Sequence, residues 1–419
     1  MSLPASLQGP VLVVAASPDA ELVSALAAAG AFPVIESGVA DAFKAAVSVN
    51  PAAVVIDEPD AGALDAARAL ARHVAAARPL VPLIVRVPDD AASLLPDALA
   101  VPRASSLERL IARLGAALRL RTLHASVLGR AATLRAERNI VAELPPGDPL
   151  DQATVLVIGR GRAYPALSVA VGERMGVMGA LSVDAAARCL LARDVDGLVI
   201  ADGLPARSLE AFLALLSQDS RFRDLPIAVL CAGGDVAGLS NLVCAAEPAV
   251  LLQRLVPFVR LRAFEGMLKR LLRSIECKGM LDPCTGLFNE PAFASELDRA
   301  IADAGERGVP LSLARFAFEQ PLDRRSSLDA ARLVSRLMRD ADFACRQDDG
   351  SILFAFAETD LRAAHVAARR LASVLKHTML RPGGERAGIS PSVTLATLKP
   401  SDTMLTLLAR VAPRPVAAA

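Results

Sequence analysis

Arg339, Asp342 and Arg370 have side chains of the types that bind nucleotides. Arg339 and Asp342 form an Arg-x-x-Asp pair, and Arg370 lies further on, in a segment whose apolar residues have helical spacing. An arginine guanidinium is a planar fork that matches a phosphate or the Hoogsteen edge of guanine, and a carboxylate accepts hydrogen bonds from N–H groups. The simpler alternative for Arg339 and Asp342 is an i, i+3 surface salt bridge of small energy.

The cysteines and histidines indicate neither a metal site nor a disulfide framework. No C-x-x-C pair occurs, and the four histidines are scattered. His365 lies near Arg370, but a lone helical histidine is more often a surface residue than a ligand. We expect the cysteines to be small buried hydrophobic residues. They are Cys189, Cys231, Cys244, Cys277, Cys284 and Cys345.

The length, charge and composition of the chain limit how many domains it can form and which partners it can bind. The chain has 419 residues, which is room for about three domains, and a net charge of +1 gives no overall field for nucleic acid. The chain has no Trp and one Tyr, so it offers few aromatic side chains on which bases could stack. No nucleic-acid polymer is therefore expected as a partner. No window approaches the ~20 apolar residues of a membrane span, so no membrane insertion is expected. The first residues lack a signal sequence, which makes the cytoplasm the expected location, with a cell pole as one option within it.

Short apolar strands alternate with alanine-rich helices along most of the chain, and the pattern occurs twice. This alternation is typical of a parallel sheet with helices on both faces. In the first copy we expect strands at Val11–Ala15, Ala53–Ile56 and Pro82–Val87, and helices at Ala20–Ala29, Ala63–Ala77 and Leu107–Leu118. In the second copy we expect strands at Val155–Ile158, Gly197–Ala201 and Ile227–Cys231, and helices at Glu210–Leu216 and Val250–Leu261.

Two basic helical segments and one break predict the domain boundaries. Leu118–Arg138 and Pro257–Met280 have helical spacing, and Pro145–Pro149 is a break rich in proline. The second basic helix could pair with its twin in a dimer or lie singly on the surface of its own domain. We expect three domains, at residues 1–140, 150–275 and 276–419.

The third domain resembles the GGDEF family, which makes cyclic di-GMP. Asp282-Pro-Cys-Thr-Gly-Leu-Phe-Asn-Glu-Pro-Ala-Phe293 is similar to the motif that opens GGDEF domains. Arg339 and Asp342 precede a short strand and then Asp348-Asp349-Gly350, where the family has its Gly-Gly-Asp/Glu-Glu-Phe hairpin. The resemblance implies a GGDEF-like α/β domain that has lost its hairpin sequence.

The positions matching the family's catalytic residues have also changed. Arg315 and Ala317 stand where the two metal carboxylates are expected, and Asp348 and Asp349 replace the glycines that let phosphates approach the backbone. Without hard oxygen ligands, Mg²⁺ cannot organise two triphosphates. The resemblance therefore implies that the chain has no catalytic residues, binds no metal and no cofactor, and is not an enzyme.

In the family the Arg-x-x-Asp element binds the product, cyclic di-GMP, together with an arginine on the helix after the hairpin. Arg339, Asp342 and Arg370 match this set, which implies that the chain binds cyclic di-GMP, as a stacked dimer. Further arginines, such as Arg299 or Arg307 or one from a neighbouring domain, could complete the pocket.

Both αβ repeats resemble the receiver domains of response regulators, in which an Asp after the third strand is phosphorylated beside Mg²⁺. Asp57 stands at that position and is the candidate phosphoacceptor. Ala15-Ala16 replaces the acidic pair that holds the metal, and Arg86 or Val87 replaces the hydroxyl residue. Without these carboxylates, phosphoryl transfer loses its charge neutralisation. The substitutions favour scaffolding over phosphorylation.

The second repeat departs further from the receiver pattern. Gly159-Arg160 replaces the acidic pair, Ala201 takes the phosphoacceptor register, and Asp202 follows one residue late. The predicted fold class is therefore α/β, with two doubly wound receiver-like domains, both degenerate, followed by a GGDEF-like domain.

The combined resemblance implies a cyclic di-GMP effector without catalysis. Its receiver-like domains would hold protein partners and form a homodimer, and the family makes a role in cell-cycle signalling or regulated proteolysis plausible. One alternative is a structural adaptor that has lost every ligand, and another is an active diguanylate cyclase.

Overall fold

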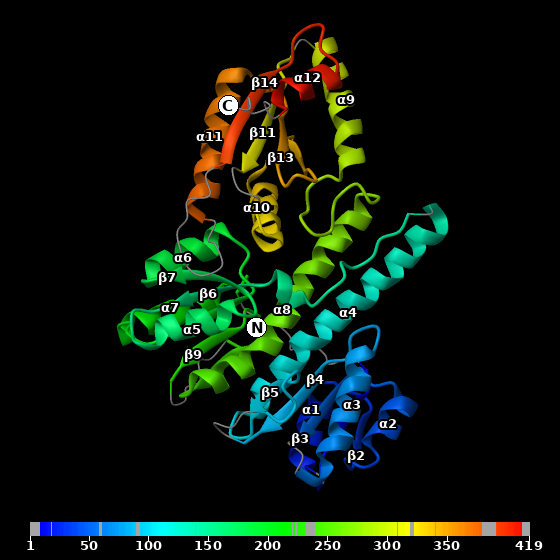
Figure 1. Ribbon diagram of the computed structural model, residues 1–419. Helices are drawn as coiled ribbons and strands as arrows, with labels where there is room; N and C mark the ends of the chain where they lie inside the picture. Colours follow the sequence, from blue (N-terminus) through cyan, green and yellow to red (C-terminus); the bar gives the residue numbers. More distant parts are fainter. Residues whose placement is uncertain are drawn as a thin grey trace. The chain divides into compact units, whose positions relative to one another are not determined.

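The computed structural model describes residues 9–17, 19–57, 61–88, 93–138, 140–219, 221–222, 224–231, 239–307, 309–318, 322–339, 341–378 and 391–412. The chain divides into two compact units (Figure 1). The first contains residues 1–130 and 148–268, and the second contains residues 131–147 and 269–419. Over the described ranges, no helix combines the length and apolar content of a membrane span.

The first unit begins with a five-stranded parallel sheet in the order β2-β1-β3-β4-β5. Its strands are β1 (Val11–Val14), β2 (Val34–Ser37), β3 (Ala53–Asp57), β4 (Leu83–Val87) and β5 (Leu99–Pro102). Its helices are α1 (Ala20–Ala28), α2 (Ala42–Val49), η1 (Ala61–Ala63), α3 (Leu64–Ala76) and α4 (Leu107–Arg138).

Helices cover both faces of this sheet, which explains its continuous apolar strands. Alternate residues point to opposite faces, so Val11 and Val13 pack with α1 and α4, whereas Leu12 and Val14 pack with α2 and α3. The carboxyl ends of the parallel strands lie at one edge. Asp57 ends β3 there, and the register of β3 and β4 places it opposite Arg86.

A second five-stranded parallel sheet follows with the equivalent order, β10-β9-β8-β6-β7. Its strands are β6 (Thr154–Ile158), β7 (Gly176–Ala180), β8 (Gly197–Ile200), β9 (Ile227–Leu230) and β10 (Leu242–Ala245). Its helices are η2 (Pro149–Gln152), α5 (Ala163–Gly172), α6 (Val183–Ala192), α7 (Ala206–Gln218) and α8 (Pro248–Glu276).

The two parallel sheets pack together through α4 and α8, and one hydrophobic cluster contains side chains from both. Arg113 of α4 is 2% exposed and donates to the carbonyl oxygens of Ser240 (2.8 Å) and Leu242 (2.6 Å) beside the second sheet. Arg254 of α8 is 3% exposed and donates to the carbonyl oxygen of Pro88 (3.3 Å) beside the first. Each arginine is the seventh residue of its helix, so the two contacts are reciprocal.

The second unit is built on a four-stranded antiparallel sheet in the order β12-β13-β11-β14. Its strands are β11 (Ser312–Phe318), β12 (Phe343–Arg346), β13 (Ile352–Phe356) and β14 (Pro391–Thr397). Its helices are α9 (Glu290–Arg307), α10 (Arg324–Leu337), α11 (Leu361–Thr378) and α12 (Met404–Val411).

Two hydrophobic layers lie on opposite faces of this antiparallel sheet. Phe354 and Phe356 of β13 pack with α10 and α11, whereas Leu353 and Ala355 pack with α9 and α12. The alternation along one strand fixes which helices share a face. In Figure 1, α11 lies beside β14, and α9 lies on the other side of the sheet.

The α/β class and the parallel sheets agree with the expectation from sequence. All six strands and five helices expected in the two repeats are present, within a few residues at most ends. The two basic helical segments are continuations of α4 and α8, and α8 runs through Pro257. The three sheets fall one in each expected domain range, but the boundaries of independently folding domains remain a prediction.

The expectation for the cysteines was correct only in part. All six are free thiols, and Cys345 is buried, which raises the pKa of its thiol to about 12. Cys277 is exposed because it follows the last residue of α8, where nothing described covers it, and the other four are half-buried.

Candidate functional site

The Asp282 motif forms a turn that docks beside the antiparallel sheet. Asp282 accepts a hydrogen bond from the hydroxyl of Thr285 (2.6 Å), and Gly286 has a φ of 77°, which favours glycine. The backbone N–H of Phe288 then donates to the carbonyl oxygen of Ala344 in β12 (2.9 Å). The turn therefore joins the start of the unit to the strand that follows Asp342.

Arg339 and Asp342 lie together in the connection between α10 and β12. The backbone N–H of Asp342 donates to the carbonyl oxygen of Arg339 (3.1 Å), and the positive charge of Arg339 acts on the Asp342 carboxylate. Arg339 is exposed and its side chain forms no hydrogen bond or ion pair with another described residue. Among the described residues, the pair is therefore a compact turn and not a closed surface salt bridge.

Asp342 is the buried member of the site, at 7% exposure. Burial raises the pKa of its carboxyl, although a hydrogen bond from the backbone N–H of Ala357 and the charge of Arg339 act in the opposite direction. Only Oδ1 is held in this way, by Ala357 at 3.1 Å. Oδ2 has no hydrogen-bond partner among the described residues, so one acceptor remains for a ligand.

Arg370 lies on the exposed side of α11, the helix that begins just after Ala357. α11 and α10 pack on the same face of the sheet, and Arg339 lies in the connection that follows α10. Within the described ranges, Arg370 forms no hydrogen bond or ion pair, including with Arg339 or Asp342. The structure thus joins two of the three predicted residues directly and presents the third as an exposed guanidinium.

The two further arginines considered from sequence do not join this group. Arg299 is exposed on α9, beneath the opposite face of the sheet, and pairs with Glu296. The side chain of Arg307 lies outside the described residues.

At the other end of the sheet, Arg315 and Asp349 close the hairpin between β12 and β13. They form an ion pair and a hydrogen bond, and Asp349 Oδ1 also accepts from the backbone N–H (3.0 Å) and hydroxyl (2.6 Å) of Ser351. Burial alone would raise the pKa of Asp349, but the bonds from Ser351 and the charge of Arg315 lower it overall. Sequence reasoning noted both substitutions separately and missed that they meet.

The same hairpin contains Gly350, with a φ of 80°. A glycine is thus retained where the turn needs a left-handed residue, whereas Asp348 and Asp349 precede it. Among the described residues, no group of three or more Asp, Glu, His or Cys side chains gathers where it could hold a metal. In this region the guanidinium of Arg315 faces the carboxylate of Asp349.

Asp57, in the first unit, also meets an arginine. Arg86 Nη1 lies 3.5 Å from Asp57 Oδ1 and forms an ion pair and a hydrogen bond with Asp19, which precedes α1. Asp57 Oδ1 is buried and accepts no hydrogen bond from a described residue, and Arg86 lies within ion-pair distance of it. Asp19 comes from the loop after Ala15-Ala16, and its distance from that pair in sequence is why it was missed.

Asp202, in the second repeat, is used as a helix cap. Its carboxylate accepts from the backbone N–H groups of Arg162 and Ala163 (both 3.1 Å) at the start of α5. A Cβ on Gly161 would lie 2.1 Å from Asp202 Cγ, so the close approach depends on that glycine. The carboxylate satisfies N–H groups that a helix terminus leaves free.

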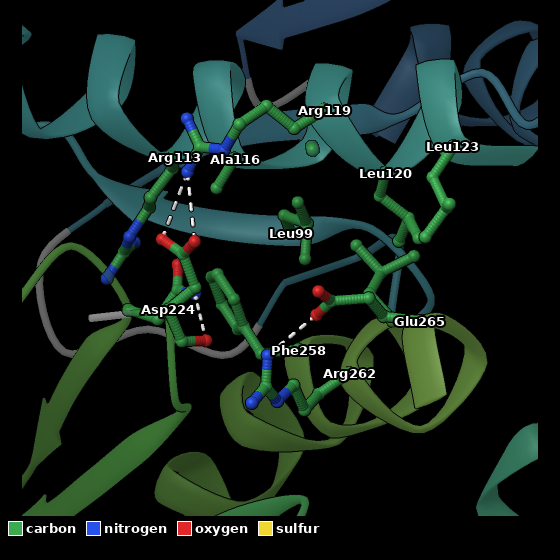
Figure 2. Close-up of a pocket in the computed structure, with 13 residues that line it drawn as sticks. Leu99, Arg113, Ala116, Arg119, Leu120, Leu123, Asp224, Phe258, Arg262 and Glu265 are labelled. Atoms are coloured by element: carbon green, nitrogen blue, oxygen red, sulfur yellow. Dashed lines mark hydrogen bonds and ion pairs between the residues drawn. The ribbon is translucent and has the colours of Figure 1, made fainter. Parts of the chain in front are cut away.

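A cavity of about 160 Å³ lies between α4 and α8 in the first unit (Figure 2). Its charged side chains already have partners. Arg119 pairs with Asp224 (3.0 Å) and Arg262 with Glu265 (2.7 Å). Arg113 is held by three carbonyl oxygens and lies over the ring of Phe258. The cavity therefore offers a ligand few unsatisfied groups, and Arg339 and Asp342 remain the candidate site.

Comparisons with known proteins give similarity only to solved structures. No protein-family model matches the chain, and no curated protein does. The coiled coil and GGDEF domain of DgcB from Caulobacter crescentus, in complex with cyclic di-GMP, is 22% identical, covers 34% of this chain and 82% of that chain, and has a TM-score of 0.30. The FimX GGDEF domain from Pseudomonas aeruginosa is 21% identical to this chain and has a TM-score of 0.28. The match covers 32% of this chain and 88% of that chain. The diguanylate cyclase SiaD from Pseudomonas aeruginosa, in complex with its activator SiaC, is 21% identical to this chain and has a TM-score of 0.31. The match covers 35% of this chain and 60% of that chain. At these TM-scores the similarity decides nothing about what this chain binds or does.

Proposed function

We propose that this chain is a cyclic di-GMP effector with a GGDEF-like domain that does not make the dinucleotide. The observation that carries the proposal is the contrast between two ends of one sheet. At one end Arg339 and Asp342 keep groups available to a ligand, and at the other end Arg315 and Asp349 satisfy each other.

The ligand chemistry follows from the three groups at the first end. The exposed guanidinium groups of Arg339 and Arg370 suit phosphates and guanine Hoogsteen edges. Asp342 Oδ2 suits the N1–H and amine of guanine, because a carboxylate only accepts. A stacked dimer of cyclic di-GMP offers several phosphates and guanine edges at once, which suits two arginines and one aspartate.

Calorimetric titration with cyclic di-GMP tests this site, and Asp342→Asn is the sharpest variant. The amide oxygen introduced by this substitution can still accept from the Ala357 N–H, but the amide NH₂ then stands where the guanine needs an acceptor. We expect Asp342→Asn and Arg339→Ala each to weaken binding more than tenfold, since losing one partner of a buried charged pair costs about 2–5 kcal/mol. Asp349→Ala, at the opposite end of the sheet, should change binding little. Equal binding by wild type and Arg339→Ala would contradict the assignment.

The lack of cyclase activity is the second part of the proposal. Cyclase chemistry needs metal ions and close approach of triphosphates to backbone. Arg315 brings a positive charge to the metal position, and Asp348 and Asp349 bring negative charges to the phosphate position. Highly purified protein incubated with GTP and Mg²⁺ or Mn²⁺ should yield no cyclic di-GMP, and product above a buffer control would overturn this part.

The receiver-like sheets of the first unit are proposed as the scaffold that holds protein partners. Asp57 and Asp202 are both engaged inside their own domains, which supports scaffolding over phosphorylation. We also propose a homodimer through these sheets, and light scattering that gives only the monomer mass, with and without cyclic di-GMP, would remove it. If no dinucleotide binds, the alternative is an adaptor that has lost its ligands.

A further inference from the structure

α11 has an unbalanced charge. The helix contains no Asp or Glu, whereas the whole chain has 46 Lys and Arg against 45 Asp and Glu. Its Lys and Arg side chains are all exposed, and none forms a hydrogen bond or ion pair with another described residue. They are Arg362, Arg369, Arg370 and Lys376.

Three of these cations form a single row. Arg362, Arg369 and Lys376 recur every seven residues, so they lie along one side of the helix over about 21 Å, at 1.5 Å per residue. We call them the cationic row. Val366 lies beside the row, between Arg362 and Arg369, and is 67% exposed. A large apolar side chain thus stands uncovered next to unpaired charges.

The rotation of α11 separates the cationic row from the proposed dinucleotide site. Ala364, Ala368 and Leu371 are buried against the sheet, so the row faces away from it. Arg370 follows Arg369 by one residue and therefore lies about 100° around the helix, on the other flank of Val366. A dinucleotide held by Arg370 and Arg339 leaves the row open.

A second copy of this chain fits the row poorly. α9 is the acidic helix of the same unit, with Glu290, Glu296, Asp298, Asp303 and Glu306. It covers the face of the sheet opposite α11, so α9 of one copy on α11 of another makes a head-to-tail contact. Such contacts do not close into a dimer. A different acidic protein is the better match.

We propose that the cationic row docks an acidic helix of a partner protein. The seven-residue period of the row matches carboxylates at seven-residue intervals along the partner, because helices that lie side by side repeat their contacts at this period. Val366 supplies an apolar contact between the charges. The row spans two heptads, so a partner helix of about three heptads presents one carboxylate to each of the three cations. The interaction is independent of cyclic di-GMP, so it stands or falls separately from the proposed function.

The test uses the full chain and a fluorescein-labelled, helix-forming peptide of three heptads. The peptide carries Glu once per heptad and Leu where it would meet Val366, and a second peptide has the same composition in scrambled order. Anisotropy titrations should give saturable binding of the heptad peptide that weakens with salt, since the contacts are exposed charges. A triple variant of the row, Arg362→Gln, Arg369→Gln and Lys376→Gln, should bind the heptad peptide about tenfold more weakly. The reason is that it loses three ion pairs of modest energy.

A matched control removes the same charge elsewhere, by Arg72→Gln, Arg103→Gln and Arg207→Gln, which are exposed residues of the first unit. This variant should bind the peptide as wild type does, and so should Arg370→Ala. Equal binding of the heptad and scrambled peptides, an equal loss in both triple variants, or no saturable binding overturns the proposal. Row-dependent binding to phosphatidylserine vesicles or duplex DNA but not to the peptide also overturns it, as does row-dependent self-association without peptide.

Discussion

Three aspartates in this chain, each beside a position that chemistry could use, interact with the chain's own groups. Asp57 faces the guanidinium of Arg86, Asp349 faces that of Arg315, and Asp202 accepts from backbone N–H groups. A guanidinium is a fixed positive charge with five donors, so it neutralises carboxylates without any ion from solution. At Asp57 and Asp349 the arginine side chains therefore act as permanent counter-charges.

Removing Arg86 tests this arrangement at Asp57. Arg86→Ala leaves the carboxylates of Asp19 and Asp57, both partly buried, facing each other without a cation. We expect the free energy of unfolding to fall by about 1–3 kcal/mol, because the unpaired carboxylates keep their desolvation penalty. Adding Asp57→Asn to Arg86→Ala should recover part of the loss in urea denaturation. Equal stability of the single and double variants would show that Asp57 does not need Arg86.

The burial of His124 leads to a prediction of how the free energy of unfolding depends on pH. Its Nδ1 accepts from the backbone N–H of Leu80 (3.0 Å), and its Nε2 is buried without a hydrogen-bond partner among the described residues. Burial lowers the pKa of His124 below its ordinary 6.5, and the charges of Arg78 and Arg121 add to this. Since the unfolded chain then binds the proton more readily, stability is complete above about pH 6.5 and falls as pH decreases below it.

The loss for one proton is at most about 1.4 kcal/mol per pH unit. His124→Gln keeps an acceptor for Leu80 and should flatten the curve between pH 5 and pH 7, as measured by urea denaturation at each pH. His365→Gln, an exposed histidine, should leave the curve as it is in wild type. A wild-type curve that is level across this range would contradict the role given to His124.

Part of the residue-level picture was available from the sequence. The resemblance to GGDEF and receiver domains indicated Arg339, Asp342 and Asp57, because each stands at the family's offset from a strand that its apolar residues reveal, and their roles stay a prediction. The meeting of Arg315 with Asp349 could not be predicted in this way. A long side chain can reach several neighbours, and only the register of β11 against the hairpin decides which one it finds.

At the scale of elements, the start of α5 depends on one small residue. Gly161→Ala would bring a Cβ to 2.1 Å from Asp202 Cγ, which pushes the carboxylate off the N–H groups it caps. We expect a loss of about 1–2 kcal/mol, the usual range for a helix cap. Gly129→Ala in α4 is the control, since nothing lies within 4 Å of its added Cβ. It should be neutral or stabilising by up to about 1 kcal/mol, from helix propensity. Equal effects of the two substitutions on the thermal midpoint would count against the cap.

Two of the strands that sequence reasoning missed share a physical cause. β7 (GVMGA) contains two glycines, and β2 contains Glu36, so neither is the β-branched run that identifies β1 and β3. Both are edge strands that pair on one side only, with β6 and β1. Their extended conformation comes from that pairing and not from their own preference, so a local pattern does not reveal them.

At the scale of the first unit, Arg113 joins the two parallel sheets. Arg113→Ala removes the donor from the carbonyl oxygens of Ser240, Leu242 and Ala100 in a buried site. We expect a loss of at least about 3 kcal/mol, because hydrogen bonds to charged groups contribute about 1.5–3 kcal/mol each. Arg119→Ala breaks an exposed pair with Asp224 and should cost at most about 1 kcal/mol. Similar losses for the two variants in chemical denaturation would mean that the buried arginine does not hold the sheets together.

The reciprocal arginines of α4 and α8 have a consequence for how the paired sheets respond to dilution. Two separate molecules that met through this face would part as their concentration fell, following mass action. Here the two sheets belong to one chain, so each meets the other at an effective concentration set by the connection between them and not by the amount of protein in the cell. The pairing is therefore as complete in a single molecule as in a concentrated solution. A cell that makes few copies of this chain still has every copy with its two sheets joined.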